Sequence, residues 1–199
     1  MQPRNGYTVT ELMVAVTILG IAAVASVPNI TSYLRSRNAA TATEQVGAHL
    51  RVARSRAVLE GNDYVVQFTG ANTYQVVDDD GGGNGIPGAA GYDVTNRSNG
   101  QADAGELVMG PFTLPQDIAF ATVAGIQNPF TGTELDAPIT FGEVNGTRAI
   151  VFHSNGTADE GGYVALAPQT DVGADSARRT RVLQLTASTG SVQSRAAGR

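Results

Sequence analysis

The feature that most constrains this chain is an apolar run close to its N-terminus. Residues 12–27 read LMVAVTILGIAAVASV, and the 24 residues of the wider segment 7–30 carry one charged side chain, Glu11. About 20 helical residues, at about 1.5 Å each, cross the apolar core of a bilayer. The segment 7–30 therefore predicts a membrane-spanning helix, which Pro28 can kink without ending.

Two alternatives to this helix are a cleaved secretory signal peptide and an ordinary membrane anchor. A signal peptide has a basic start, a short apolar core and a small-residue exit. Arg4 fits the basic start, but Glu11 stands where the apolar core should begin, and helix-favouring sequence resumes after the run. A carboxylate at the edge of an apolar run is costly and usually serves a function. Glu11 is therefore a candidate functional residue.

The segment 31–60 continues as an amphipathic helix. Its apolar residues recur at spacings of three, four and seven, which is typical of a helix with one buried face. Gly61-Asn62 predicts the end of the helix. His49 is expected to be a surface or packing histidine. The predicted stripe consists of Tyr33, Leu34, Ala40, Val46, Leu50, Ala53, Ala57 and Val58.

From residue 61 to residue 199 the apolar pattern has a period of two, which predicts a β-rich head. Asn145-Gly146 and Asn155-Gly156 each stand between apolar runs, and this dipeptide is the strongest short hairpin signal, so we expect a three-strand meander. The fold class is α+β, with a long N-terminal helix packed on an antiparallel sheet or sandwich. The expected strands are 64–68, 73–77, 106–109, 118–121, 139–141, 148–152, 163–167 and 181–186.

Charge is segregated along the chain, although the net value is only −5. All 13 basic residues are arginines; residues 1–59 and 176–199 are basic, and residues 60–175 are strongly acidic. An acidic protein is a poor candidate for nucleic-acid binding. The basic tail, however, offers Arg178, Arg179 and Arg181 as candidate DNA contacts, because clustered arginines hold phosphate backbones. A solvated, frayed terminus is the alternative.

A Gly- and Asp-rich insertion occupies residues 78–105. Asn99, Gly100, Asp103 and Glu106 occupy four positions of a calcium-loop spacing, although Thr95 and Arg97 fill two liganding places wrongly. The three carboxylates of residues 78–80 could complete such a site from the neighbouring turn. A polar insertion that binds no metal is the alternative. The metal ligands are therefore unknown, and calcium is the candidate cofactor. Gly83, Gly85 and Gly88 match a phosphate-loop pattern, but Pro87 interrupts it and no helix follows.

Nothing in the sequence predicts catalysis. The chain has no cysteine, which excludes disulfides and thiolate sites, and only two histidines. It contains neither G-x-S-x-G nor H-E-x-x-H, and His153 beside Ser154 has no recognisable acid partner motif. We expect a protein that is not an enzyme, with no catalytic residues.

The segment Gly6-Tyr7-Thr8-Val9-Thr10-Glu11 resembles the prepilin leader of type IV pilins and type II secretion pseudopilins. The resemblance implies that residues 1–6 are a leader, that a prepilin peptidase cleaves between Gly6 and Tyr7, and that the new terminus is methylated. It also implies that Glu11 pairs with the N-terminal amine of a neighbouring subunit in a filament. Tyr7 departs from the family, in which phenylalanine is usual at this position.

The stretch Leu50–Ala57, reading LRVARSRA, and the stretch from Phe152 to Leu166 are similar to the GspH/FimT family of minor pilins and pseudopilins. This resemblance implies a structural subunit of a type IV pilus or type II secretion filament. Its implied partners are copies of itself, other pilins or pseudopilins, the prepilin peptidase and the bacterial inner membrane, before it enters a periplasmic or cell-surface filament. The alternative that it implies is a minor pilin that binds DNA during uptake through the Arg-rich C-terminal segment.

Overall fold

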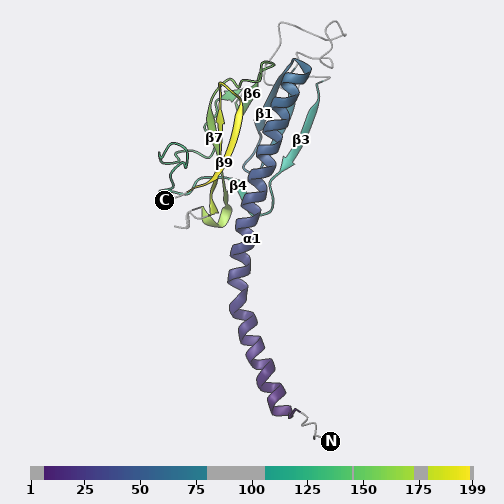
Figure 1. Ribbon diagram of the computed structural model, residues 1–199, viewed down its shortest axis with the longest axis vertical. Coiled ribbons are helices and arrows are strands. Elements are labelled where there is room, and N and C mark those ends of the chain that lie inside the picture. Colours follow the sequence, from purple (N-terminus) through teal and green to yellow (C-terminus); the bar gives the residue numbers. More distant parts are fainter. Residues whose placement is uncertain (1–6, 80–105, 145, 173–178, 198–199) are drawn as a thin grey trace, which may run out of the picture.

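One long helix carries the whole architecture. The computed structural model describes residues 7–79, 106–144, 146–172 and 179–197, with the side chains of residues 25–29 left aside. Helix α1 (Val9–Glu60) has 52 residues, which corresponds to about 78 Å. Its C-terminal half lies along a β-rich head, and its N-terminal half extends away from the head (Figure 1). This arrangement confirms the predicted α+β class.

Both ends of α1 are set by local sequence. The Thr8 side chain accepts a hydrogen bond from the backbone N–H of Glu11 at the N-terminus. At the C-terminus Gly61 adopts a left-handed conformation (φ 75°), and its N–H donates to the carbonyl of Ala57 at 3.0 Å. Glycine reaches this conformation without the steric cost that a Cβ brings. The helix stop predicted at Gly61-Asn62 is therefore confirmed.

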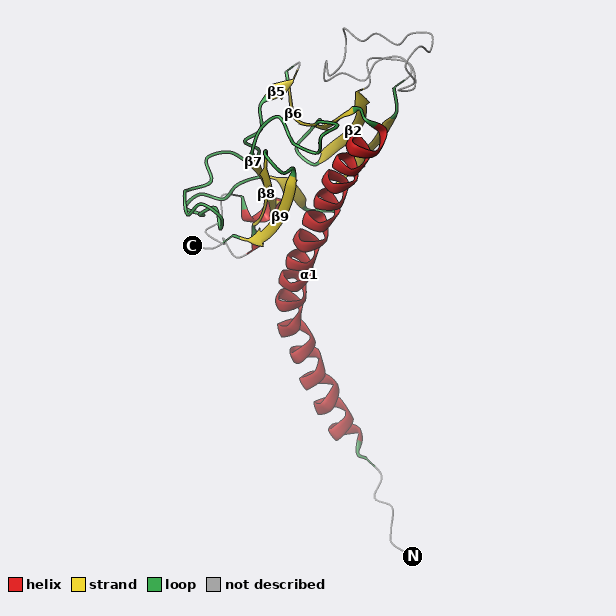
Figure 2. Cartoon of the chain, turned by 45° about the horizontal axis from the view of Figure 1, so that its top comes forward, coloured by secondary structure: helices red, strands yellow, loops and turns green. Residues whose placement is uncertain are grey.

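The head contains two antiparallel sheets, whose strands Figure 2 shows beside α1. The first sheet has the order β3-β2-β1-β6-β5, and the second has the order β4-β7-β8-β9. A short 3-10 helix, η1 (Gln169–Asp171), follows β7. The strands are β1 (Asp63–Phe68), β2 (Thr73–Asp79), β3 (Val108–Thr113), β4 (Ile118–Phe120), β5 (Glu143–Val144), β6 (Thr147–Phe152), β7 (Gly162–Pro168), β8 (Arg181–Thr186) and β9 (Ser191–Ala196).

The main core lies between α1 and both sheets. The buried helix residues are mostly small, and they pack against aromatic and aliphatic side chains such as Tyr64, Phe141 and Leu185. The predicted stripe is right at Val46, Leu50, Ala53 and Ala57, which are buried. It is wrong at Tyr33, Leu34 and Val58, which are 65%, 48% and 50% exposed. The head covers the helix only from about Ala39. The buried helix residues of this core are Ala39, Ala42, Val46, Leu50, Ala53 and Ala57.

Most predicted strands are confirmed with small shifts of their ends. The strand predicted at 106–109 lies instead at β3, Val108–Thr113. The strand predicted at 139–141 is wrong, because only an isolated bridge forms there, between Ile139 and Val164.

The predicted three-strand meander is also wrong. The hairpin expected at residues 145–146 forms between β5 and β6. After Asn155-Gly156 the chain makes one bridge, from Phe152 to Ala158, and then enters β7 in the other sheet. The second turn therefore carries the chain from one sheet to the other, because both sheets must bury a face against α1.

The C-terminal segment is a strand rather than a frayed terminus. β9 pairs with β8 along its full length, from Thr186 opposite Ser191 to Arg181 opposite Ala196. Sequence analysis missed this strand because SVQSRA contains a single large apolar residue, Val192. The guanidinium of Arg195 also lies 4.7 Å from the centre of the Phe130 ring, so it packs on the head.

Arg54 of α1 joins two turns of the head. Its Nε donates to the carbonyl of Gly156 at 2.9 Å. Gly190, in the β8–β9 turn, has a left-handed φ of 58°, and a Cβ built there would lie 2.7 Å from Arg54 Nε and even closer to the Gly156 oxygen. Because the backbone oxygen cannot swing away, Gly190 leaves no room for a side chain.

We expect Gly190→Ala to destabilise the head by about 2–4 kcal/mol, through left-handed strain together with the clash. Gly125→Ala is the matched control, because Gly125 also has a left-handed φ (73°) but nothing lies within 4 Å of its Cβ position. It should cost only about 1–2 kcal/mol. Denaturant unfolding of the full chain in detergent measures both, and equal losses would contradict the close approach described at Gly190.

His49 packs in an aromatic cluster between α1 and the first sheet. Its Nδ1 lies 2.8 Å from the hydroxyl of Tyr74, and its ring centre lies 3.9 Å from that of Phe112. Burial lowers the pKa of His49 below its usual 6.5 and raises the pKa of Tyr74 to about 12. The folded state therefore favours the neutral imidazole.

A lowered histidine pKa makes stability depend on pH in a defined direction. The stabilisation is complete above pH 6.5, the usual value of the free side chain, and is lost as the pH falls through the lower folded value. We expect His49→Gln to remove this loss, because glutamine keeps a polar partner for Tyr74 without titrating. Comparing the thermal midpoints of both proteins from pH 7.5 to pH 5.5 measures it, and a constant difference would contradict it.

Candidate functional site

The N-terminal half of α1 exposes apolar side chains in every direction. A helix that is apolar all round requires a surrounding of lipid or protein. In the part of the chain that the structure describes, no helix reaches the length and apolarity needed to cross a membrane. The exposed residues, all between 56% and 77% accessible, are Val9, Leu12, Met13, Val14, Val16, Ile18, Leu19, Ile21, Val24 and Ile30.

Glu11 lies at the start of this surface, in the first turn of α1. One carboxylate oxygen, Oε2, accepts from the backbone N–H and from the hydroxyl of Thr8, each at 2.9 Å. These bonds complete a capping box, in which residues Thr8 and Glu11 satisfy each other's backbone N–H groups. A charged side chain is thus held beside the chain terminus expected after cleavage. The predicted pairing of Glu11 with a neighbouring subunit stays a prediction.

The predicted cleavage site lies just before the helix. Tyr7 is 89% exposed, and Gly6 lies outside the described residues. The capping box begins one residue later, at Thr8, so the peptide bond before Tyr7 precedes the folded part of α1. A protease would therefore not have to unwind the helix to reach it.

Of the three arginines predicted to contact DNA, the structure describes Arg179 and Arg181, and Arg179 is engaged within the head. Arg178 lies outside the described residues, and Arg181 stands in β8 opposite Ala196. Arg179 donates from Nε and Nη2 to the two carboxylate oxygens of Asp171, at 2.9 and 2.7 Å. Asp171 is 1% exposed, so Arg179 compensates a buried charge within the head. No motif in the sequence marks this pair, because Asp171 lies outside the basic tail.

Two other sequence-predicted sites lie mostly beyond the described residues. Gly83, Gly85, Gly88 and Asp103 are outside them, whereas Asp78, Asp79 and Glu106 are inside. Among the described residues, no group of three or more His, Asp or Glu side chains is arranged to hold a metal. The calcium loop stays a prediction.

His153 has an acid partner that the sequence did not reveal. Its Nδ1 lies 3.1 Å from Oδ2 of Asp63 at the start of β1, so the contact links the end of β6 to the neighbouring strand. The partners are 90 residues apart, and only the pairing of β1 with β6 brings them together.

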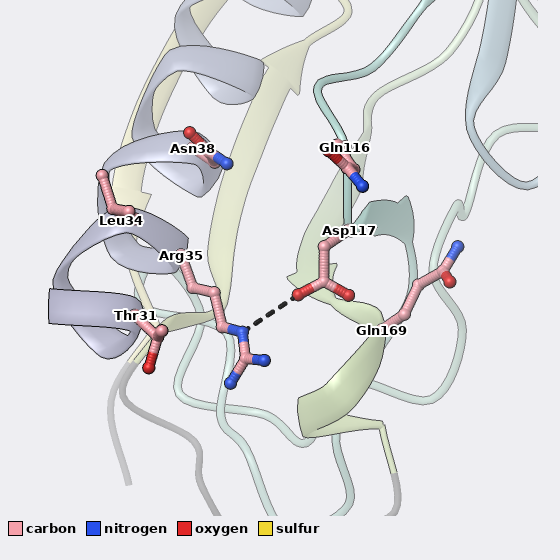
Figure 3. Close-up of a pocket in the computed structure, with 7 residues that line it drawn as sticks. All are labelled: Thr31, Leu34, Arg35, Asn38, Gln116, Asp117 and Gln169. Atoms are coloured by element: carbon pink, nitrogen blue, oxygen red, sulfur yellow. Dashed lines mark hydrogen bonds and ion pairs between the residues drawn. The ribbon is translucent and has the colours of Figure 1, made fainter. Parts of the chain in front are cut away.

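A polar pocket at the junction of stem and head was also missed by sequence analysis. It has a volume of about 490 Å³, and its centre is an ion pair from Arg35 Nε to Asp117 Oδ2 at 3.1 Å. Figure 3 shows α1 on one side of it and the residues before β4 and in η1 on the other. We call it the junction pocket; its lining residues are Thr31, Leu34, Arg35, Asn38, Gln116, Asp117 and Gln169.

A second contact reinforces this junction. Arg179, besides its pair with Asp171, donates from Nη1 to the hydroxyl of Ser32 on α1 at 3.4 Å. Asp117 has a positive φ of 70°, which is uncommon for a residue other than glycine and often marks a functional or strained position. The carbonyl of Asp117 also accepts from the N–H of Gln169 at 2.8 Å.

Relatives of the chain match only part of it. A fimbrial protein of Pseudomonas aeruginosa is 34% identical over 73 residues, which cover 37% of this chain and 47% of that protein. A second fimbrial protein of the same organism has the same values. The chain thus spans about half the length of the curated relatives it matches. No solved structure matches.

Two family models place the chain more firmly. The model described as Prokaryotic N-terminal methylation motif matches residues 1–27, which include Gly6, Tyr7 and Glu11. The model described as Type II transport protein GspH matches residues 42–189, which cover the packed half of α1 and nearly all of the head. The chain belongs to the family of Type II transport protein GspH and carries at its N-terminus the prokaryotic methylation motif.

Proposed function

We propose that this protein is a structural subunit, a minor pilin or pseudopilin, of a type IV pilus or type II secretion filament. The observation that carries the proposal is the N-terminal half of α1, which exposes apolar side chains on every side. The head does not cover this part of the helix. Packing that surface among the helices of neighbouring subunits would bury it. The methylation motif over residues 1–27 supports the same function.

The proposed sequence of events follows from the order of elements along the chain. The subunit is first held in the bacterial inner membrane by residues 7–30. A prepilin peptidase removes residues 1–6, and the new terminus at Tyr7 is methylated. The helix then passes from lipid into a filament, which exchanges one apolar surrounding for another at little cost. The head is displayed on the filament in the periplasm or at the cell surface.

Glu11 sets the register of this packing. A carboxylate among apolar helices is costly unless an opposite charge compensates it, and the free amine at Tyr7 of a neighbouring subunit supplies that charge. The apolar residues of the segment would let neighbouring helices slide along one another. A single ion pair allows only one relative position. The role is assembly and involves no catalysis.

We expect Glu11→Ala to leave leader cleavage intact and to lower incorporation into filaments at least about tenfold, because removing one partner of a buried pair costs about 3–5 kcal/mol. Glu11→Gln separates charge from helix capping, since glutamine at this position also completes a capping box. It should fail like alanine. Immunoblots of sheared filaments measure incorporation.

The matched control for Glu11 is Glu44→Gln, which removes a carboxylate from an exposed position of the same helix. This variant should incorporate normally. Normal incorporation of Glu11→Gln would show that the charge of Glu11 does not set the register.

We expect the mature subunit to begin at Tyr7 and to carry one added methyl group at its amine. Intact-mass spectrometry of the protein purified from its native membrane or filament measures this, with a strain lacking the prepilin peptidase as control. The control should retain residues 1–6. A mature chain that begins at another residue would show that the leader has been placed wrongly.

A further inference from the structure

The junction pocket lies on the side of the head from which the stem emerges. Figure 1 shows α1 continuing past β4 toward the N-terminus, beyond the end of the head. From Val9 to Thr31 the helix rises about 33 Å, which is close to the apolar thickness of a bilayer, about 30 Å. On the proposed function, on which this inference rests, the pocket is therefore at the level of the lipid headgroups.

The polar groups of the pocket suit an anionic ligand. Arg35 uses only its Nε in the bond to Asp117, and the described residues give it no other hydrogen bond. In Figure 3 its two outer nitrogens point away from Asp117, to the side of Thr31, which is the N-terminal direction of α1. The side chains of Asn38 and Gln116 line the other side of the ion pair, and no acidic side chain other than Asp117 is among the lining residues.

The charge around the junction pocket also favours an anionic ligand. Arg35 and Arg37 follow the apolar segment, and no acidic residue lies between Leu12 and Thr43. Asp117 and Asp171, acids that the structure describes on this side of the head, are each engaged by an arginine. A guanidinium with free donors at the membrane level is the usual partner of a phosphate.

We infer that the junction pocket binds the phosphate of an anionic phospholipid headgroup while the subunit is stored in the membrane. The outer nitrogens of Arg35 hold the phosphate oxygens. Asp117 positions the guanidinium through Nε and competes with the lipid for it. The headgroup would fix the height and tilt of the head above the bilayer before assembly.

The test uses the full chain in vesicles of phosphatidylcholine with increasing phosphatidylglycerol. Since the chain has no cysteine, Thr170→Cys in η1 gives a unique position for a fluorophore, which headgroup-spin-labelled lipid quenches on approach. Quenching should rise with phosphatidylglycerol. Arg35→Gln should need at least about thirtyfold more of this lipid for half-maximal quenching, because it loses charge-assisted hydrogen bonds to phosphate besides the diffuse attraction of one positive charge.

Arg37→Gln is the matched control, because Arg37 is an exposed arginine at the same level of the stem. It should raise the lipid requirement by at most about fivefold, the diffuse contribution of one arginine near an anionic surface. An equal loss in both variants would mean a diffuse attraction to the surface and would overturn the site. Asp117→Asn should act in the opposite direction to Arg35→Gln and lower the lipid requirement; asparagine also tolerates the positive φ. A purely structural ion pair would make both variants lose quenching together.

Two further outcomes would show that the junction pocket binds something other than a lipid headgroup. Inorganic phosphate that abolishes the lipid effect at millimolar concentration would assign the pocket to a free anion. Quenching that depends on the protein-to-lipid ratio would assign it to a second subunit. Either would overturn the proposal. A chain that fails to insert into any vesicle would contradict the proposed membrane stage, whereas insertion without dependence on phosphatidylglycerol contradicts only the lipid site.

Discussion

The exposed apolar surface of the N-terminal half of α1 is the constraint on which the rest of the structure depends. Burying such side chains is worth about 25 cal/mol for each square ångström, and the head offers them nothing to pack against. The helix must therefore stay continuous while its surroundings change from an apolar medium to a folded head. The capping box at Thr8 and the left-handed Gly61 hold its two ends, so one rigid element carries both surfaces.

The C-terminal half of α1, which packs against the head, buries mostly small side chains. Alanines at 39, 42, 53 and 57 are fully buried, and a Cβ on Gly47 would already lie 3.3 Å from a methyl group of Leu183. The short side chains let the sheets come close to the helix backbone and bind the head firmly to the stem. Two of the four edge strands of the head, β3 and β4, are partly blocked against pairing with another chain. Pro111 in β3 lacks an N–H, and the N–H of Phe120 in β4 donates to the carbonyl of Ala71.

Sequence reasoning succeeded where one local signal determines the structure. The helix end at Gly61 and the strands β1, β2 and β6 follow from residues within each segment. It failed where the outcome depends on distant partners. The turn at Asn155-Gly156 was recognised, but whether the chain then stays in one sheet depends on α1, which lies between both. The polar strand β9 exists because β8 offers it an edge, and neither its composition nor its period shows this.

The candidate site also has one part that follows from local sequence and one part that depends on distant residues. Glu11 stands out in the sequence because its surroundings are apolar, and its contacts to Thr8 are local. The Arg35–Asp117 pair joins residues separated by 82 positions, and no motif marks either of them.

The arginines of the chain have different tasks that composition cannot separate. Arg179 neutralises Asp171, a carboxylate so deeply buried that loss of its partner would leave an uncompensated charge, which costs several kcal/mol. Arg35 is more than one-third exposed, and such a pair adds about 0–1 kcal/mol to stability. Arg35 therefore contributes little to holding the fold together. What its pair with Asp117 does provide is a fixed direction for the guanidinium, at the level where the apolar stem meets the polar head.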